Sequence, residues 1–332
     1  MAYFAVSSHK TAVKVQKGSN AAGKHVTVPA VVVSRRGRFT VTERRVITNV
    51  ASPIKEEWQV NLHGPTQEVM RGDLPGLVTV EEVRALEAEL DSGAGVEALR
   101  RFNKALRAVP ADKWEAVLRP VFNELCFNLE SFNPAFAACL LQVQRTIGVS
   151  DYVRRDMALK NLIQPLAGEY GMHNNQPQLK THRELFSDFF MSLFGYPLPQ
   201  LLADSPAPAA AQLLYSQMMR DILGGGGHED PLAQASYALG YNLAIEYLAD
   251  YEKTWMLDSF RDLNSRVLKK DIDWIFLEVH AEGEAEHAAI GHNAVLNIVP
   301  TEHADILRAA MADHDRDFAV FYNRMAELME GH

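Results

Sequence analysis

The sequence is poor in cysteine and contains no long uninterrupted run of apolar residues, and each shortage excludes a class of protein. Its 332 residues include two cysteines, Cys126 and Cys139, which do not form a Cys-x-x-Cys pair. A disulfide framework is therefore not expected, and a reducing compartment, the cytoplasm, is predicted. Because a membrane helix needs about 18 or more consecutive apolar residues, neither a membrane span nor a membrane partner is predicted. The first residues also do not show the basic region and apolar run of a secretory signal.

The composition that is present is that of a globular protein with an uneven charge. Apolar residues make up 47% and charged residues 23% of the chain, which predicts a sizeable core in one or two domains. Residues 1–60 hold 10 of the 33 Lys+Arg and 3 of the 42 Asp+Glu, a charge of +7, so the remainder carries −9 − 7 = −16. No nucleic-acid motif accompanies the basic arm. We expect it to dock on the acidic body or on a second subunit, with an anionic partner as the alternative.

Residues 1–75 have the pattern of a β-rich extension. Two runs rich in β-branched residues, 25–34 and 39–48, flank Arg36-Gly37-Arg38. Such runs on either side of turn residues predict a hairpin. Residues 58–62 are expected to add a third short strand. The predicted domains are therefore this extension and a helical domain over residues 76–332.

The pattern becomes helical from Thr79 onward. Thr79-Val80-Glu81-Glu82 forms a capping-box motif, which predicts a helix start. We expect Pro134 to open a new helix in its first turn and the prolines between 197 and 208 to form an irregular connector. The predicted helices span approximately residues 79–90, 95–108, 111–132, 134–147, 151–171, 179–194, 209–223, 231–264, 271–297 and 301–330. The fold class is therefore mainly α.

One predicted helix concentrates residue types that bind metals. His280, Glu284 and His287 have i, i+4, i+7 spacing, which places them within an arc of about 60° on one helix face. Two imidazoles and a carboxylate suit iron, and the carboxylate can bridge a second ion. The alternative is a solvated face that happens to carry two histidines. Against that alternative, the neighbouring positions on this face hold apolar or small residues: Phe276, Leu277, Gly283, Gly291 and Ala294.

A two-metal site needs further ligands from other helices. A ferritin-like bundle would supply Glu-x-x-His from two helices, but residues 284–287 are its only occurrence, and the zinc-peptidase motif His-Glu-x-x-His does not occur. Glu169 ends one predicted helix and His182 begins the next. Glu246 interrupts an otherwise apolar helix, where a lone buried carboxylate is costly unless it is paired or bound to metal. An exposed Glu246 is the alternative.

Together these segments resemble the haem-oxygenase-like di-iron oxidases, over roughly residues 110–330. The resemblance rests on the His-x3-Glu-x2-His of the helix above and on three further segments: Glu169-Tyr170-Gly171, His182-Arg183-Glu184-Leu185-Phe186, and Leu239-Gly240 followed by Glu246. It implies a haem-oxygenase-like multi-helical bundle that binds two Fe2+, with O2 as co-substrate. The implied metal ligands are Glu169, His182, Glu246, His280, Glu284 and His287.

Two of the implied ligands depart from a simple match. The family often has Asp where this chain has Glu284. His173 lies four residues after Glu169 and would replace His182 if the helix continued, but Gly171 and the asparagines at 174 and 175 predict that the helix stops first.

The resemblance implies an O2-dependent oxidase or oxygenase acting on a small molecule, with an external reductant and a possible homodimer. We expect N-oxygenation of an amino-acid-derived amine in specialised metabolism, with C–C cleavage or desaturation of a fatty or amino acid as the alternative. Lys180, Arg183 and Arg220 are candidates for holding a substrate carboxylate. Other interpretations are a haem-binding or haem-degrading protein, a thiaminase-like hydrolase with a cysteine nucleophile, and a non-catalytic protein that binds partners through its basic arm.

Overall fold

The computed structural model describes residues 26–33, 39–46, 74–172 and 180–331. The side chains of the first two segments and of residues 282–289 lie outside this description. By its contacts the chain divides into two compact units, Met1–Leu62 and His63–His332, and each is described by itself. The division lies thirteen residues before the predicted domain boundary at residue 75.

The first unit contains a two-stranded antiparallel ribbon. Strands β1 (Val26–Val33) and β2 (Phe39–Val46) pair with Val33 opposite Phe39 and Val26 opposite Val46. β-Branched residues, which favour extended backbone, are frequent in both strands. The expected third strand at residues 58–62 lies outside the described residues, and a wider β-rich extension stays a prediction.

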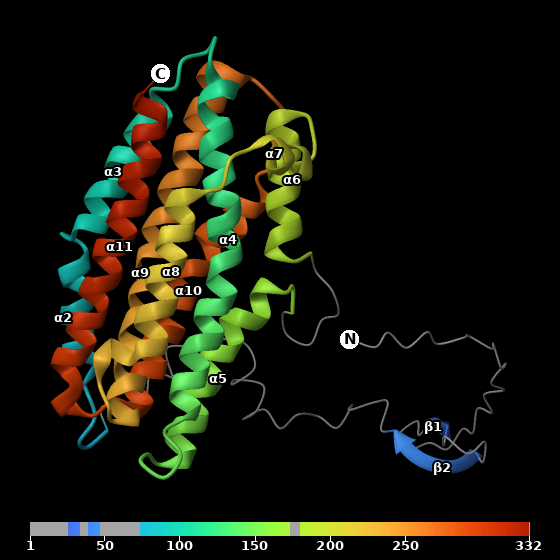
Figure 1. The fold of residues 1–332 in the computed structure, drawn as a ribbon, viewed down its shortest axis with the longest axis vertical. Coiled ribbons are helices and arrows are strands. Elements are labelled where there is room, and N and C mark those ends of the chain that lie inside the picture. Colours follow the sequence, from blue (N-terminus) through green and yellow to red (C-terminus); the bar gives the residue numbers. More distant parts are fainter. Residues whose placement is uncertain (1–25, 34–38, 47–73, 173–179, 332) are drawn as a thin grey trace. The chain divides into compact units, whose positions relative to one another are not determined.

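The second unit is a helical bundle, so the chain is mainly α. Figure 1 shows α3 and α11 side by side at one edge of the bundle, α9 and α10 in its middle, and α4 alongside α8. The helices are α2 (Val80–Leu90), α3 (Ala94–Arg107), α4 (Trp114–Gln144), α5 (Tyr152–Glu169), α6 (His182–Phe194), α7 (Leu198–Asp204), α8 (Ala209–Gly224), α9 (Pro231–Leu263), α10 (Ile275–Ile298) and α11 (Ala304–Glu330).

Several helices begin at side chains that accept hydrogen bonds from their first turn. Thr79 and Thr181 form capping boxes with Glu82 and Glu184, and Asp151 and Asp230 cap α5 and α9 through their carboxylates. Such caps satisfy backbone N–H groups that have no partner inside the helix. These local signals mark the starts of α2, α5, α6 and α9.

Two helices have their N-terminal N–H groups bound by a carboxylate from another helix. Asp315 of α11 accepts from the N–H groups of Ala94 and Gly95 at 2.9 and 2.8 Å, at the start of α3. Glu124 of α4 accepts from Ala211 N–H at 2.8 Å, at the start of α8. A Cβ on Gly95 would lie 2.7 Å from Asp315 Oδ1, so the contact requires glycine there. Each of these carboxylates locks one helix against another.

The structure corrects the prediction of two helices on either side of Pro134. α4 runs without interruption from Trp114 to Gln144 and contains both Pro120 and Pro134. A proline inside a helix costs about 3 kcal/mol, but buried side chains after it, such as Phe136 and Cys139, hold the helix together through packing. The predicted irregular connector is also partly wrong, because α7 forms within it with Pro197 at its N-cap and Pro199 in its first turn.

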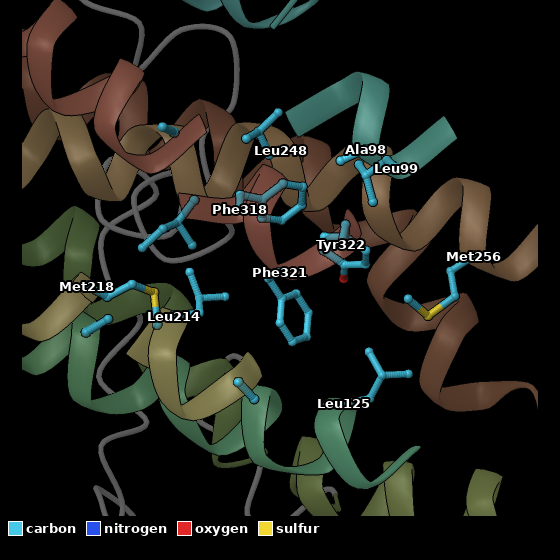
Figure 2. Packing of buried hydrophobic residues seen from close by; sticks show 14 of the residues in the cluster. Ala98, Leu99, Leu125, Leu214, Met218, Leu248, Met256, Phe318, Phe321 and Tyr322 are labelled. Carbon is cyan, nitrogen blue, oxygen red and sulfur yellow. The ribbon is translucent and has the colours of Figure 1, made fainter. Parts of the chain in front are cut away.

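The core of the bundle draws side chains from helices distant in sequence. Figure 2 shows residues of α3, α4, α8, α9 and α11 meeting in one apolar cluster, with Phe321 and Tyr322 among them. Nearer to α6, Phe122 of α4 is surrounded by ring partners at centroid distances of 5.2–5.9 Å: Phe186, Phe189, Phe190, Phe194 and Phe260. This aromatic group fixes α6, and therefore His182 at its first position, against α4 and α9.

None of the helices in the described ranges combines the length and the apolar character that crossing a membrane requires.

Candidate metal centre

The first two predicted ligands lie at facing helix ends. α5 ends at Glu169, and Gly171 then adopts a positive φ of 73°, a conformation that favours glycine and ends the helix. α6 begins at His182, where Thr181 and Glu184 form the capping box. Glu169 Oε1 and His182 Nδ1 lie 2.8 Å apart. The two helix ends thus hold a carboxylate and an imidazole in hydrogen-bond contact.

The third predicted ligand, His280, comes from the middle helix α10. It is 4% exposed, and its ring centroid lies 4.3 Å from that of His182. Its Nδ1 lies 2.6 Å from the backbone carbonyl oxygen of Phe276. A carbonyl oxygen only accepts, so Nδ1 carries the proton and Nε2 carries the lone pair that a metal would use. Histidine ligands are commonly oriented in this way by a backbone carbonyl.

Glu169, His182 and His280 have the geometry of a partial metal site. One donor atom from each lies within 4.8 Å of the others. Two donors bound to one ion at about 2.1 Å can be at most about 4.2 Å apart, so a small contraction would bring the three onto one ion. One carboxylate and two imidazoles fit iron among the first-row metals.

Glu246 lies beside this group. It is 3% exposed, so the prediction of a carboxylate inside the apolar helix α9 is correct and the alternative of an exposed side chain is wrong. It lines a small, partly open cleft. The cleft is lined by Leu129, Phe132, Phe136, Glu169, Glu246, Ala249, Lys253 and His280. Four of the six predicted ligands therefore gather around or beside one cleft.

The other two predicted ligands are on α10, whose backbone includes Glu284 and His287 one and two turns beyond His280. Their side chains lie outside the described residues, as does the competing candidate His173. All six residues as metal ligands stay a prediction.

The cations predicted to hold a substrate carboxylate do not line this cleft. Lys180 pairs with Asp188 at 2.5 Å, Arg183 pairs with Glu130 at 3.1 Å, and Arg220 pairs with Asp221. The cation in the cleft wall is Lys253, which was not among the residues predicted from the sequence. The signal was available, because Glu246, Ala249 and Lys253 have the i, i+3, i+7 spacing of one helix face.

Both cysteines belong to the core. Cys126 and Cys139 are buried, and burial raises the pKa of each thiol. Arg183 donates to Cys126 Sγ at 3.0 Å and opposes the effect there. Since the thiolate is the nucleophile, these environments do not favour the thiaminase-like interpretation.

Comparison with known proteins shows a similarity in fold. No family model matches the chain, and no curated protein matches it. Two crystal structures of a CADD-like protein of unknown function from Nostoc punctiforme are similar to it. One has a TM-score of 0.57 and 15% identity, covering 74% of this chain and 96% of that protein. The other has a TM-score of 0.56 and 14% identity, covering 76% and 95%. At this identity the likeness shows a shared helical fold.

Proposed function

We propose that this protein is a non-haem di-iron enzyme of the haem-oxygenase-like type that uses O2 to oxidise a small molecule. The observation that carries the proposal is the group of Glu169, His182 and His280, whose donor atoms lie within 4.8 Å of one another. Glu246 lines the same cleft as two of these residues. Three helices, α5, α6 and α10, converge there, as a site that binds metal between helices requires.

In this proposal some residues bind the metal ions, one orients a ligand, and others form the wall of the cleft. Glu169, His182 and His280, with Glu246, Glu284 and His287, would hold the ions. When bound, two Fe2+ would supply the electrons with which O2 is activated, and an external reductant would restore them. Phe276 fixes the tautomer of His280 through its carbonyl. Leu129, Phe132 and Phe136 line the cleft with apolar surface, which excludes water from a bound substrate.

The proposed reaction is N-oxygenation of an amino-acid-derived amine, and C–C cleavage or desaturation of a fatty or amino acid is the alternative. Both need an apolar cleft beside the metal ligands. Product analysis after single turnover with an amine and with a fatty acid of equal chain length distinguishes them.

The decisive experiment is anaerobic titration of the metal-free protein with Fe2+, followed by metal counting. We expect about two irons per chain, because three carboxylates and three imidazoles are enough for two ions. His280→Ala should lose at least one iron, whereas His228→Ala, in the loop before α9, should lose none. Full retention of iron by His280→Ala would remove this residue from the ligands. Fewer than one iron in the unaltered protein, together with a Soret band after haem addition, would instead indicate a haem protein.

A further inference from the structure

The outer face of α5 carries several exposed apolar side chains. α5 packs against α4 and α10, and Ala158 and Leu162 on its inner face are buried. In the described part of the chain fifteen large apolar side chains are exposed, and seven of them lie between residues 147 and 172: Ile147, Val149, Tyr152, Val153, Ile163, Tyr170 and Met172. At exposed fractions of 47–69% these seven offer on the order of 800 Å², whereas the largest apolar patch of a typical monomer has about 300–600 Å². An apolar surface of this size indicates an interaction surface.

These side chains follow one stripe along the helix. At 100° per residue, Tyr152, Ile163 and Tyr170 fall within an arc of about 20°, and the stripe from the first to the last is about 27 Å long. Ile147 and Val149 lie in the turn before α5, at the same end as Tyr152. From this turn α5 runs back along α4 (Figure 1). The exposed residues therefore lie along one side of the bundle.

Two opposite charges lie on the same face between the apolar residues. Asp156 and Lys160 are about 40° and 80° around the helix from Tyr152, and both are exposed. Arg155, whose side chain is 14% exposed, contacts Asp156 Oδ1 at 3.3 Å, and a carboxylate can accept further hydrogen bonds. With Asp156 and Lys160 the face presents one exposed charge of each sign, which favours neither a strongly basic nor a strongly acidic partner.

A second copy of α5 matches this pattern of charges and apolar residues. Two antiparallel helices can be placed so that Asp156 lies opposite Lys160 of the second copy. The same register brings Tyr152 within one residue, about 1.5 Å along the axis, of Ile163 of the second copy. The twofold axis then passes beside Ala158, and symmetry forms each contact twice. The face is therefore complementary to itself in charge and in apolar surface.

We propose that the outer face of α5 is the interface of a homodimer in which the α5 helices of two copies pair antiparallel. The apolar stripe of on the order of 800 Å² matches what one partner contributes to an interface of standard size. The two acid–base pairs set the register and exclude a parallel arrangement, which would place like charges side by side. The interface needs no iron and does not rest on the proposed function.

The pairing also determines how far apart the two candidate metal centres lie. Glu169 is eleven residues from the twofold axis in each copy, about 16 Å along the helix, so the two Glu169 residues are about 30 Å apart. Each copy therefore builds its own centre, and the interface contributes no ligand to it.

Sedimentation equilibrium of the full-length, metal-free protein tests the dimer. We expect a dimer at about 10 μM, because interfaces of standard size have dissociation constants in the micromolar range or below. A protein that is still monomeric at about 100 μM would overturn the proposal.

Charge reversal tests the register. Asp156→Lys alone and Lys160→Asp alone each place like charges opposite each other at two symmetric positions, and each should raise the dissociation constant at least about tenfold. The double substitution Asp156→Lys with Lys160→Asp restores opposite charges and should return the dissociation constant to within about threefold of the original. Single reversals that leave the constant unchanged, or a double variant that does not recover, would overturn the antiparallel pairing. Thermal unfolding by circular dichroism should be similar in all of these variants, since both positions are exposed.

A pair of apolar positions tests the face itself. Ile163 is 52% exposed on α5, and Leu213 is 48% exposed on α8. Ile163→Glu places a carboxylate in the apolar stripe and should raise the dissociation constant at least about tenfold, while the control Leu213→Glu should leave it unchanged. A dimer that Leu213→Glu weakens and Ile163→Glu does not would place the interface on another face and overturn the assignment.

Discussion

His314 of α11 is enclosed in the bundle with its ring edge-on to Tyr241 at a centroid distance of 4.9 Å. Neither ring nitrogen has a hydrogen-bond partner among the described residues. Burial lowers the pKa of His314 from its ordinary value of 6.5 to about 3. The folded protein therefore keeps this imidazole neutral at pH values where an unfolded chain would protonate it.

This pKa difference predicts an acid-sensitive stability. Between about pH 6.5 and pH 3 the unfolded chain binds one more proton than the folded chain at this residue, so the free energy of unfolding falls as the pH falls through this range. The slope from one such group is about 1 kcal/mol per pH unit. Urea unfolding of the protein and of His314→Leu at several pH values between about 4 and 7 measures it.

In His314→Leu the part of the slope due to this residue should disappear, and the free energy of unfolding at neutral pH should change little because no hydrogen bond is lost. His303, whose Nδ1 contacts Ser236 Oγ at 2.9 Å, serves as the control in His303→Leu, which should keep the slope. Parallel pH profiles for the protein and His314→Leu would contradict the prediction.

Residue types and spacing make Glu169, His182, Glu246 and His280 candidates, because a charge or a face of imidazoles stands out in an apolar pattern. Their role as metal ligands is what the resemblance to the haem-oxygenase-like di-iron oxidases implies. The contact between Glu169 and His182 could not be derived, since it depends on how the two helix ends face each other across residues 170–181. Lys253 was not predicted because a lysine near charged neighbours looks like a surface residue until its burial is known.

At the scale of elements, the capping boxes of α2 and α6 have the same hydrogen bonds, but only α6 carries a predicted metal ligand. Thr79 and Thr181 receive nearly identical hydrogen bonds from Glu82 N–H and Glu184 N–H, at 3.1 and 3.2 Å. α6 carries His182 at its first position, while α2 carries none of the predicted ligands.

We expect Thr181→Ala and Thr79→Ala each to reduce the free energy of unfolding by about 1 kcal/mol. Thr181→Ala alone should also weaken iron binding, by about tenfold, because the first turn that orients His182 loosens. Chemical denaturation measures the first effect, and anaerobic Fe2+ titration measures the second. Equal iron affinities in the two variants would show that the cap supports the helix without positioning the ligand.

The helices also show where local patterns fail. The capping box at Thr79 predicts the start of α2 correctly because the signal is contained within one turn. Pro134 was interpreted as a helix start, but α4 continues through it, since the packing of its buried face outweighs the lost hydrogen bond. The helix boundaries at Pro134 and in the connector that contains α7 were predicted wrongly, because packing against other helices, and not the local sequence, determines them.

At the scale of the whole molecule, the helical unit has its own core. Among the residues whose side chains are described, the buried apolar cluster runs from Val78 to Met329, within the segment His63–His332. The charge of the chain is divided in the same way, with +7 on residues 1–60 and −16 on the rest.

Deleting residues 1–62 should therefore leave the bundle folded, with a Tm within about 2 °C of that of the full chain, and with the same iron stoichiometry. Circular dichroism and metal counting measure both. If the basic arm docks on a second subunit, the deletion should also lower the molar mass in light scattering. Loss of the cooperative unfolding transition would show that the arm is part of the folding unit.

The carboxylate of Asp315 at the start of α3 has a consequence for the order of events during synthesis. It lies 220 residues after Gly95, whose N–H it binds, so the first turn of α3 waits for most of the chain to leave the ribosome. Until then its amides are paired with water, and α3 lacks the helix that packs beside it. A chain that ends before α11 lacks both the carboxylate that caps α3 and the helix that packs against it. In such a chain α3 is expected to stay exposed to chaperones and proteases.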